Sequence, residues 1–285
     1  TNGNFTGIRI MGIFQNNLLA ASAAAASAGG GGFYSHQIEQ SARFDSASSS
    51  YLTKTFSGAG NRRTGSVSVW VKRSTLSTQQ QLFGGHVSNG DQDQLLSFNS
   101  SSSADHADSM SQWWDGANNG DETTKALFRD ISGWNHFLLA WDTTQGTDTN
   151  RVKLYLNGSQ ITSFESYNGG TVSYPSQDLQ TFTFSNCRHN IASRQASGPG
   201  NFFDGYLAEF IAIDGTQIAP TDVGESKNGV WIPKQYTGSF GTNGFHLKFE
   251  NASDFGNDSS GNNNDFTVYN MGTDHQVLDS PTFGS

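Results

Sequence analysis

Short runs of alternating polar and apolar residues, separated by turn-forming residues, restrict the possible folds of this chain more than any other feature. Residues 66–72 read Ser-Val-Ser-Val-Trp-Val-Lys, and residues 135–142 and 205–215 are similar apolar-rich runs. A period of two is typical of a strand with one buried face. No stretch in this series follows the 3.6-residue period of an amphipathic helix. The pattern therefore predicts an all-β antiparallel sandwich.

Other segments extend this series of predicted strands. The dipeptide Asn157-Gly158 predicts a two-residue hairpin turn between strands at 151–156 and 159–164. Residues 99–125 are rich in Ser, Asp, Asn and Gly, and we predict a long loop there. Further strand-like runs lie at residues 81–85, 94–98 and 181–187.

The composition provides enough apolar residues for a core, and it argues against a nucleic-acid-binding surface. Phe occurs 21 times and charged residues make up 14% of the 285 residues, against about 25% in typical domains. The net charge is −9, and no Lys/Arg run is longer than two residues, so the basic surface that nucleic acid requires is missing. Cys187 is the single cysteine, which excludes an intrachain disulfide. We expect Cys187 to be buried and structural.

The first 40 residues differ from the rest and are predicted to form an N-terminal arm. Residues 18–28 are mostly alanine and resemble the core of a signal peptide, but they are too short and weakly apolar to span a membrane. Residues 29–32 are four glycines. Such a segment cannot bury enough surface to order itself, so we expect a neighbouring subunit to order it and the chain to form a homo-oligomer. The alternative is a flexible tail.

Five motifs in a fixed order resemble the laminin-G-like, concanavalin-type jelly-roll family. The resemblance covers about residues 40–225 and implies an antiparallel sandwich at 41–225, followed by a β-rich C-terminal segment at 226–285 that packs on the sandwich or on a neighbour. Because this fold hosts lectins, glycanases and structural modules, it implies much less about function. The motifs lie at residues 42–52, 67–73, 134–137, 152–158 and 203–209.

A second resemblance concerns both ends of the chain. Residues 243–250, 257–266 and 278–282 look like a segment of virion proteins from marine tailed bacteriophages, where it follows a laminin-G-like domain. Residues 11–18 and the Ala/Gly-rich arm are similar to the start of such proteins. Those proteins often continue into further domains. The resemblance implies a structural role in a virion.

Catalytic patterns are missing from the sequence. Glycanases of this fold place two carboxylates around the scissile bond, and the nearest pair here is Glu209 and Asp214. Their odd spacing puts them on opposite faces of a strand. Glu209 also lies in the motif at residues 203–209, and the resemblance to the jelly-roll family implies a packing role for it. His136 is predicted to be a core or edge residue, and no Gly-x-Ser-x-Gly motif occurs. We predict a non-enzymatic protein, with a glycan hydrolase as a remote alternative.

Four residues in the polar stretch are candidates for binding a glycan or a partner: Trp113, Trp114, Asp115 and Asn118. Two adjacent tryptophans on a loop suit sugar stacking or anchoring of a partner. In the alternative, one or both fold back and cap the sandwich.

The remaining tryptophans are assigned structural roles. Trp70, Trp134 and Trp141 lie in strand-like runs and are predicted to be core residues. Trp231 is predicted to clasp the C-terminal segment to the domain.

A loop near the C-terminus offers oxygen ligands of the kind that Ca²⁺ prefers. These ligands belong to Asp258, Asn262, Asn264 and Asp265. The spacing does not fit an EF-hand, because no Glu closes the loop. The alternative is a turn in which the Asp and Asn side chains bond the local backbone.

Two functions remain open. In the first, the chain is a decoration, spike or fibre module of a phage virion, docked on other subunits through its arm, that can also adhere to cell-surface glycan. In the second, it is a soluble or secreted lectin that binds polysaccharide outside the cell.

Overall fold

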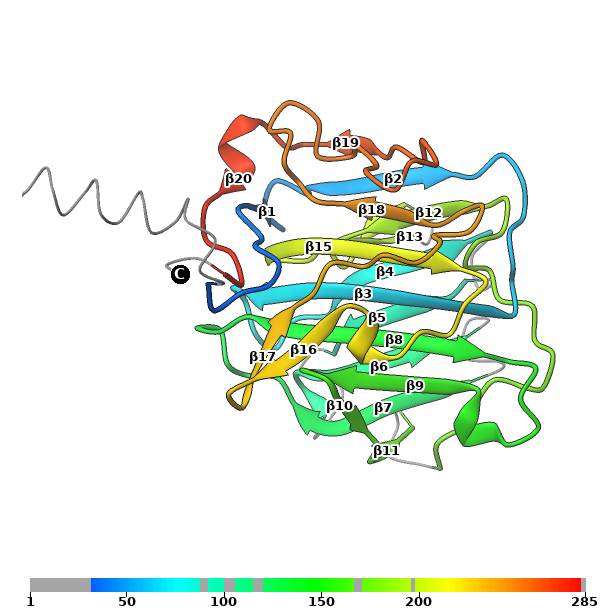
Figure 1. Ribbon diagram of the computed structural model, residues 1–285. Coiled ribbons are helices and arrows are strands. Elements are labelled where there is room, and N and C mark those ends of the chain that lie inside the picture. The colour runs from blue at the N-terminus through cyan, green and yellow to red at the C-terminus, as the bar shows by residue number, and fades with distance from the viewer. Residues whose placement is uncertain are drawn as a thin grey trace, which may run out of the picture.

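A computed structural model describes residues 32–87, 92–99, 106–114, 120–166, 171–195 and 198–282. Within these residues two eight-stranded antiparallel sheets stack into a sandwich (Figure 1). Sheet A contains, in spatial order, β10 (Ser159–Ile161), β9 (Val152–Leu156), β8 (Asn135–Asp142), β3 (Thr64–Arg73), β15 (Gly205–Asp214), β1 (Ser41–Phe44) and β20 (Gln276–Val277), and β18 (Phe245–Leu247) also pairs with β15. Sheet B contains β11 (Phe164–Glu165), β7 (Asp121–Leu127), β6 (Ser109–Trp113), β5 (Gln94–Phe98), β4 (Gln80–His86), β12 (Arg188–Ile191), β2 (Tyr51–Thr55) and β19 (Thr267–Tyr269).

Smaller elements complete the described chain. The hairpin of β16 (Gly224–Lys227) and β17 (Val230–Pro233) lies across one end of sheet A in Figure 1. The others are β13 (Arg194–Gln195), β14 (Pro199–Gly200), and the short 3₁₀ helices η2 (Asp148–Asn150), η3 (Pro220–Asp222) and η4 (Thr273–His275).

The C-terminal segment contributes strands to both sheets. β18 pairs with β15 and β20 pairs with β1 in sheet A, while β19 pairs with β2 in sheet B. Consequently the first and last described strands of the chain lie side by side (Figure 1).

The core lies between the sheets and is rich in phenylalanine. Val67, Val69 and Val71 alternate into it from β3, as the period-two pattern predicts. Phe83 of sheet B makes edge contacts with Phe210 and Phe245 of sheet A, at ring-centroid distances of 5.7 and 5.9 Å. Aromatic pairs in this geometry add to the stabilisation from buried area, so the abundant Phe side chains join the two layers.

The Asn157-Gly158 hairpin is confirmed. Leu156 pairs with Ser159 across the two-residue turn, and Asn157 and Gly158 have φ of 47° and 80°. Two successive positive φ values are typical of the type I′ turn, which favours Asn-Gly. Gly158 is required for a second reason, because a Cβ there would lie 2.4 Å from the Trp231 ring.

The prediction of a long loop over residues 99–125 is wrong. This stretch contains β6 and β7, which are joined by polar side chains as well as by the backbone. Asn99 donates hydrogen bonds to Ser109 and Ser111 at 2.8 and 2.6 Å, and Ser111 bonds Thr123 at 2.7 Å. Cross-strand polar pairs stabilise this part of the sheet. Two strands therefore form in a stretch whose polar composition had indicated a loop.

Residues 181–187 were also predicted wrongly, because they form turns and bends rather than a strand. Asp93 Oδ2 accepts hydrogen bonds from the backbone N–H and the hydroxyl of Thr183, at 2.7 and 2.8 Å. Phe184 then takes a left-handed φ of 63°, which breaks the extended conformation. Cys187, at the end of this segment, is buried as expected.

The chain itself covers the outer face of sheet A. Leu138, Ile211 and Ile213 point outward and are buried under Ile218 and Val223. Beside them Trp70, Ala208 and Ile38 form a further apolar cluster, against which Trp134 and Trp231 pack.

Trp231 packs against this apolar cluster, which confirms the prediction that it holds the C-terminal segment to the domain. Its indole N–H donates to His136 Nδ1 at 3.1 Å, and His136 Nε2 bonds Ser68 Oγ at 2.8 Å. Because indole can only donate, the Nε2–H of His136 is the donor to Ser68. Burial lowers the pKa of His136 to about 3, so the ring is neutral and structural, as predicted.

Candidate functional site

The outer face of sheet B between β4 and β19 carries hydroxyl, aromatic and cationic side chains. Leu52 is fully buried in the core, so alternation along β2 turns Tyr51, Thr53 and Thr55 to the outside. Directly paired residues of neighbouring strands share a face. The register therefore adds Tyr269 and Thr267 from β19, Arg188 and Asn190 from β12, and His86 from β4.

Two tyrosines form a flat aromatic surface on this face. The rings of Tyr51 and Tyr269 stack with centroids 4.7 Å apart and planes 6° apart. Tyr269 is 42% exposed, and Phe202 contacts Tyr51 at a centroid distance of 6.0 Å. Burial and the neighbouring Tyr269 raise the pKa of Tyr51, so its phenol is neutral. A fixed aromatic surface with polar edges is a platform on which the C–H face of a sugar can pack.

Two adjoining hollows extend from this platform across β2 and β12, and we call them together the sheet B groove. Their volumes are about 220 and 380 Å³, and they share Thr55, Arg188 and Gln195. The first is also lined by Tyr51, Thr53, Lys54, Thr267 and Tyr269, and the second by His86, Val87, Asn186 and Cys187.

The groove combines the groups that recognise hydroxyl-rich ligands. Threonine hydroxyls and the amides of Asn186 and Gln195 can donate and accept hydrogen bonds beside the aromatic platform. Among the described residues that line it, neither hollow has an Asp or Glu. Glycoside hydrolysis needs two carboxyl groups at the scissile bond. The described lining of the groove therefore offers groups suited to a sugar, and it lacks the acid pair that would cleave one.

Of the predicted binding residues, Trp114 is not an exposed platform. It is fully buried, its indole N–H donates to Glu122 at 2.9 Å, and its ring lies 5.7 Å from that of Trp141. This arrangement matches the alternative in which a tryptophan folds back into the sandwich. Burial raises the pKa of Glu122 to about 8, so its carboxyl group is protonated at neutral pH.

Trp113 lies on the opposite side of β6 from Trp114 and is partly exposed. It ends the strand in register with Gln94 of β5 and Asp121 of β7. Asp115 and Asn118, the other two predicted binding residues, lie outside the described residues.

The sequence contains only a weak signal for the sheet B groove. Residues 51–55 read Tyr-Leu-Thr-Lys-Thr and residues 267–269 read Thr-Val-Tyr, and each run alternates like an ordinary half-buried strand. Only the pairing of β19 with β2 brings Tyr51 beside Tyr269.

The four predicted calcium ligands lie in one loop, but with hydrogen bonds of the alternative kind. Asp258 Oδ1 accepts from the N–H of His246 and of Ser260, each at 2.8 Å, and Asp258 Oδ2 accepts from the N–H of Asn264 at 2.8 Å. Asp265 Oδ1 accepts from the N–H of Asp258. These carboxylates bond local backbone, as in Asp/Asn-rich turns.

The two asparagines of this loop face the neighbouring backbone. The side-chain amides of Asn262 and Asn264 donate to Gly244 O at 2.9 Å each. Asn262 also donates to Gly241 O, and Asn264 to Thr242 O. No group of three or more His, Cys, Asp or Glu side chains within the described ranges is arranged to hold a metal.

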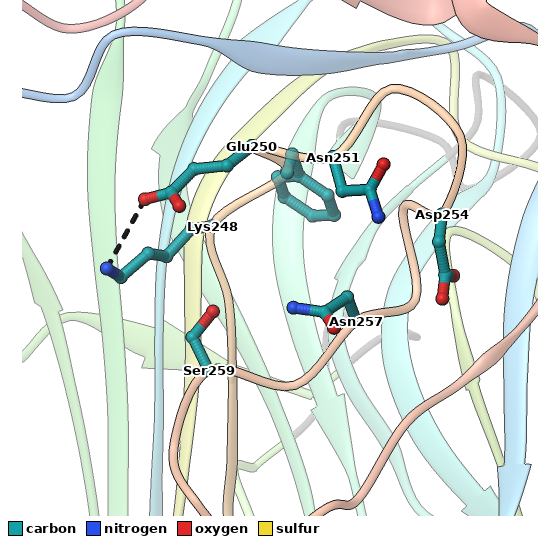
Figure 2. Close-up of a pocket in the computed structure, with 7 residues that line it drawn as sticks. Lys248, Glu250, Asn251, Asp254, Asn257 and Ser259 are labelled. Atoms are coloured by element: carbon teal, nitrogen blue, oxygen red, sulfur yellow. Dashed lines mark ion pairs between the residues drawn. The ribbon is translucent and has the colours of Figure 1, made fainter.

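A separate hollow, lined by residues that follow β18 of sheet A, differs from the sheet B groove in its chemistry (Figure 2). It has a volume of about 320 Å³, and Lys248 and Glu250 form an ion pair of 3.3 Å at its side. Asn251 Oδ1 and Asp254 Oδ1 accept backbone N–H groups of their own loop, at 3.0 and 3.1 Å. Its only aromatic lining residue, among those described, is the buried Phe249. This hollow lacks an exposed platform, so the sheet B groove is the better binding site.

Glu209 does not pair with Asp214. It lies at a β-bulge of β15 with φ of 47°, where Oε2 accepts from His246 Nε2 at 2.6 Å and Oε1 lies 3.3 Å from His36 Nε2. Burial alone would raise the pKa of Glu209, but hydrogen bonds from His246 and His36 outweigh it and lower the pKa to about 2. Asp214 instead accepts backbone N–H groups of Asn61 and Asn243. Glu209 thus joins the segment before β1 to β18.

Comparison with known proteins finds only a distant likeness to solved structures. No protein-family model and no curated sequence matches the chain. No helix in the described part of the chain is long and apolar enough to cross a membrane.

Three solved structures illustrate the likeness. A putative carbohydrate-binding protein from Bacteroides ovatus is 12% identical, with 83% of this chain and 61% of that chain covered and a TM-score of 0.47. A heptameric SAP-like pentraxin from Limulus polyphemus is 14% identical, with coverage of 65% and 80% and a TM-score of 0.41. Domains LG4-5 of the mouse laminin α1 chain are 11% identical, with coverage of 70% and 47% and a TM-score of 0.39. At such identities the likeness concerns the fold alone. The sheet order and register themselves show an antiparallel β-sandwich.

Proposed function

We propose that this chain is a non-catalytic glycan-binding sandwich that holds polysaccharide in the sheet B groove. The observation that carries the proposal is the stacked pair Tyr51–Tyr269 beside a row of threonine hydroxyls on an open sheet face. A sugar ring has apolar C–H faces and a polar rim, and the groove offers an aromatic surface and hydrogen-bonding groups to match them.

Affinity electrophoresis in gels containing a panel of polysaccharides tests this proposal. We expect at least one polysaccharide to retard the wild-type chain. Tyr269→Ala should weaken that binding about 2- to 10-fold, because an aromatic contact contributes about 0.5–1.5 kcal/mol beyond its buried area. Tyr236→Ala is the matched control, since Tyr236 packs on the outer face of sheet A. Equal retardation of the wild type and both variants would contradict the proposal.

A second proposed role is that of a virion module mounted through the N-terminal arm. It is supported by the resemblance at the two ends and by the way the arm is rooted. The N–H of Ile38 donates to Thr282 Oγ1 at 2.9 Å, and the hydroxyl of Thr282 donates to Ile38 O at 2.8 Å. Ser41 Oγ donates to Asp279 O at 2.6 Å. Segment 278–282 thus holds residues 38–41, at the junction of the arm and the sandwich, in place.

Deletion of residues 1–32 tests this second role. We expect the truncated chain to fail to enter particles and to keep its affinity for polysaccharide, because none of the described residues that line the sheet B groove belongs to the arm. The measurement is density-gradient sedimentation of particles, with fractions probed for this chain and for encapsidated DNA. Normal incorporation of the truncated chain would disprove docking through the arm.

A further inference from the structure

The charge of the sheet B groove is opposite to that of the whole molecule. The chain has 25 Asp and Glu residues against 16 Lys and Arg, and a net charge of −9. The groove nevertheless contains Arg188, and none of its described lining residues is acidic. On an acidic protein, a groove with a cationic side chain has a local positive potential, and such complementarity determines which ligand is accepted.

Arg188 is the cation best placed to contact a ligand. It is exposed at the start of β12 and makes no ion pair or hydrogen bond through its guanidinium group to a described residue. Other arginines are used inside the protein: Arg73 pairs with Asp108 at 3.0 Å, and Arg62 donates to Thr181 O at 2.7 Å. A guanidinium that is not used for stability is available for recognition.

Arg188 also lies close to the aromatic platform. It pairs in register with Thr55, on the same face as Tyr51 and Thr53, and it lines both hollows. Its charge reaches the platform, because it acts to lower the pKa of Tyr51 against the larger effect of burial. A sugar stacked on the tyrosines would therefore present its ring substituents toward Arg188. Lys54 also lines the first hollow, but alternation along β2 turns its side chain to the opposite face from Tyr51, where its ammonium group donates to Asp265 O at 3.2 Å.

We propose that the sheet B groove selects acidic glycans, in which Arg188 binds the carboxylate or sulfate group of a sugar stacked on Tyr51 and Tyr269. The inference rests on the proposed glycan-binding function and adds the substrate class to it. Guanidinium matches the geometry of such anions through two parallel N–H donors. Anionic polymer is repelled elsewhere by the net negative charge, so binding should be confined to this groove.

Two pairs of polymers, each differing only in charge, test the inference by isothermal calorimetry. The first pair is polygalacturonate and its carboxyl-reduced form, and the second is dextran sulfate and dextran. We expect the charged polymer of at least one pair to bind 10-fold or more tightly than its neutral partner, and the pair that responds distinguishes carboxylate from sulfate. Raising the salt from about 50 to 500 mM should weaken this preference, since added ions screen the attraction.

Variants assign the preference to a residue. Arg188→Gln should weaken binding of the charged polymer about 10-fold or more and leave the neutral polymer unaffected, because only the charged polymer loses a charge-assisted hydrogen bond. Arg188→Lys should retain part of the preference. Arg43→Gln is the matched control, since Arg43 is exposed on β1 of sheet A. Equal thermal melting temperatures of the wild type and the variants would show that each variant is folded.

The two proposals fail in distinguishable ways. Equal affinity for charged and neutral polymers, unchanged by Arg188→Gln but lost in Tyr269→Ala, would overturn acidic selection and leave glycan binding intact. Binding of charged polymer that Arg43→Gln weakens as much as Arg188→Gln would also overturn it, because the attraction would then be a general surface effect. Absence of binding to all four polymers would overturn acidic selection, and failure of the wider polysaccharide panel would overturn the proposed function itself.

Discussion

The outer faces of the two sheets differ in what covers them. The face of sheet A carries Leu138, Ile211 and Ile213, which lie buried beneath the chain that follows β15. The face of sheet B near its β19 edge carries threonines, Tyr269 and Arg188, and no apolar cluster of the described residues lies over it.

This difference shows how one architecture can bury one outer face and leave the other open to water. Outward-pointing Leu and Ile need a cover, since an exposed apolar patch is unfavourable in water. Threonine, tyrosine and arginine are stable in water and can exchange it for the hydroxyl groups of a sugar. We therefore expect changes on the covered face to alter the free energy of unfolding, and changes on the open face to alter binding.

The largest expected effect on the free energy of unfolding is that of Trp231→Ala. The indole packs against Gly158 and Gly224, where a Cβ would lie 2.4 and 2.2 Å from its ring, and it donates to His136. Its loss should lower the free energy of unfolding by about 3 kcal/mol, as for other tryptophans packed into a protein. Urea denaturation measures this change. Affinity for polysaccharide should stay within about 2-fold of the wild type, by analogy with independent distant sites, and a parallel loss would show that the faces are coupled.

Glu209, on the covered side of the molecule, should make the free energy of unfolding depend on pH in acid. Its folded pKa of about 2 lies below the ordinary value of 4.5. The stabilisation is therefore complete above about pH 4.5 and is lost as the pH falls toward 2, by an amount on the order of 3 kcal/mol.

The difference between wild type and Glu209→Gln isolates this contribution. Buried His136 and His189, with pKa values of about 3 and 4, also destabilise the folded state in acid, but equally in both proteins. The free energy of unfolding should therefore fall more steeply in the wild type between pH 4.5 and 2. Identical profiles in urea titrations over this range would rule out the proposed contribution.

A smaller loss of stability is expected from Ser68→Ala. This change leaves the buried Nε2–H of His136 without its acceptor at 2.8 Å. An unsatisfied buried donor costs about 1–3 kcal/mol. Ser66→Ala is a less suitable control, because Ser66 Oγ also bonds Thr216 O and the Ile218 N–H. Exposed Ser57→Ala serves better, and equal thermal melting of Ser68→Ala and this control would contradict the assigned hydrogen bond.

The smallest effect on stability is expected on the open face, from Thr267→Val. The hydroxyl of Thr267 is exposed and bonds no described residue, and valine suits a strand as well as threonine does. The free energy of unfolding should change by less than about 0.5 kcal/mol. Polysaccharide affinity should fall about 3- to 10-fold, because one hydrogen bond contributes about 1 kcal/mol. A stability loss without any change in binding would reverse the roles assigned to the two faces.

Local patterns predicted much of the sandwich. Alternation located β3, β8 and β15, and Asn157-Gly158 located the β9–β10 turn, because each depends on neighbouring residues alone. The same reasoning failed at β6 and β7, where polar side chains bond across strands, and at Phe184, where Asp93 holds a turn from 90 residues away in the chain.

The candidate site was predicted less well than the fold. Adjacent Trp113 and Trp114 suggested a binding loop, but alternation along β6 sends them to opposite sides, and Trp114 enters the core. The groove instead needs β2, β12 and β19, whose residues are far apart in the sequence.

Local patterns suffice to predict an antiparallel sandwich with turns at defined places, because a period of two and turn chemistry act over a few residues. Which face is covered and which is open is an outcome of tertiary packing. That outcome depends on the pairing of Tyr51 with Tyr269 and on the docking of Trp231 against His136. Both contacts join segments that are distant along the chain, so no local pattern encodes them.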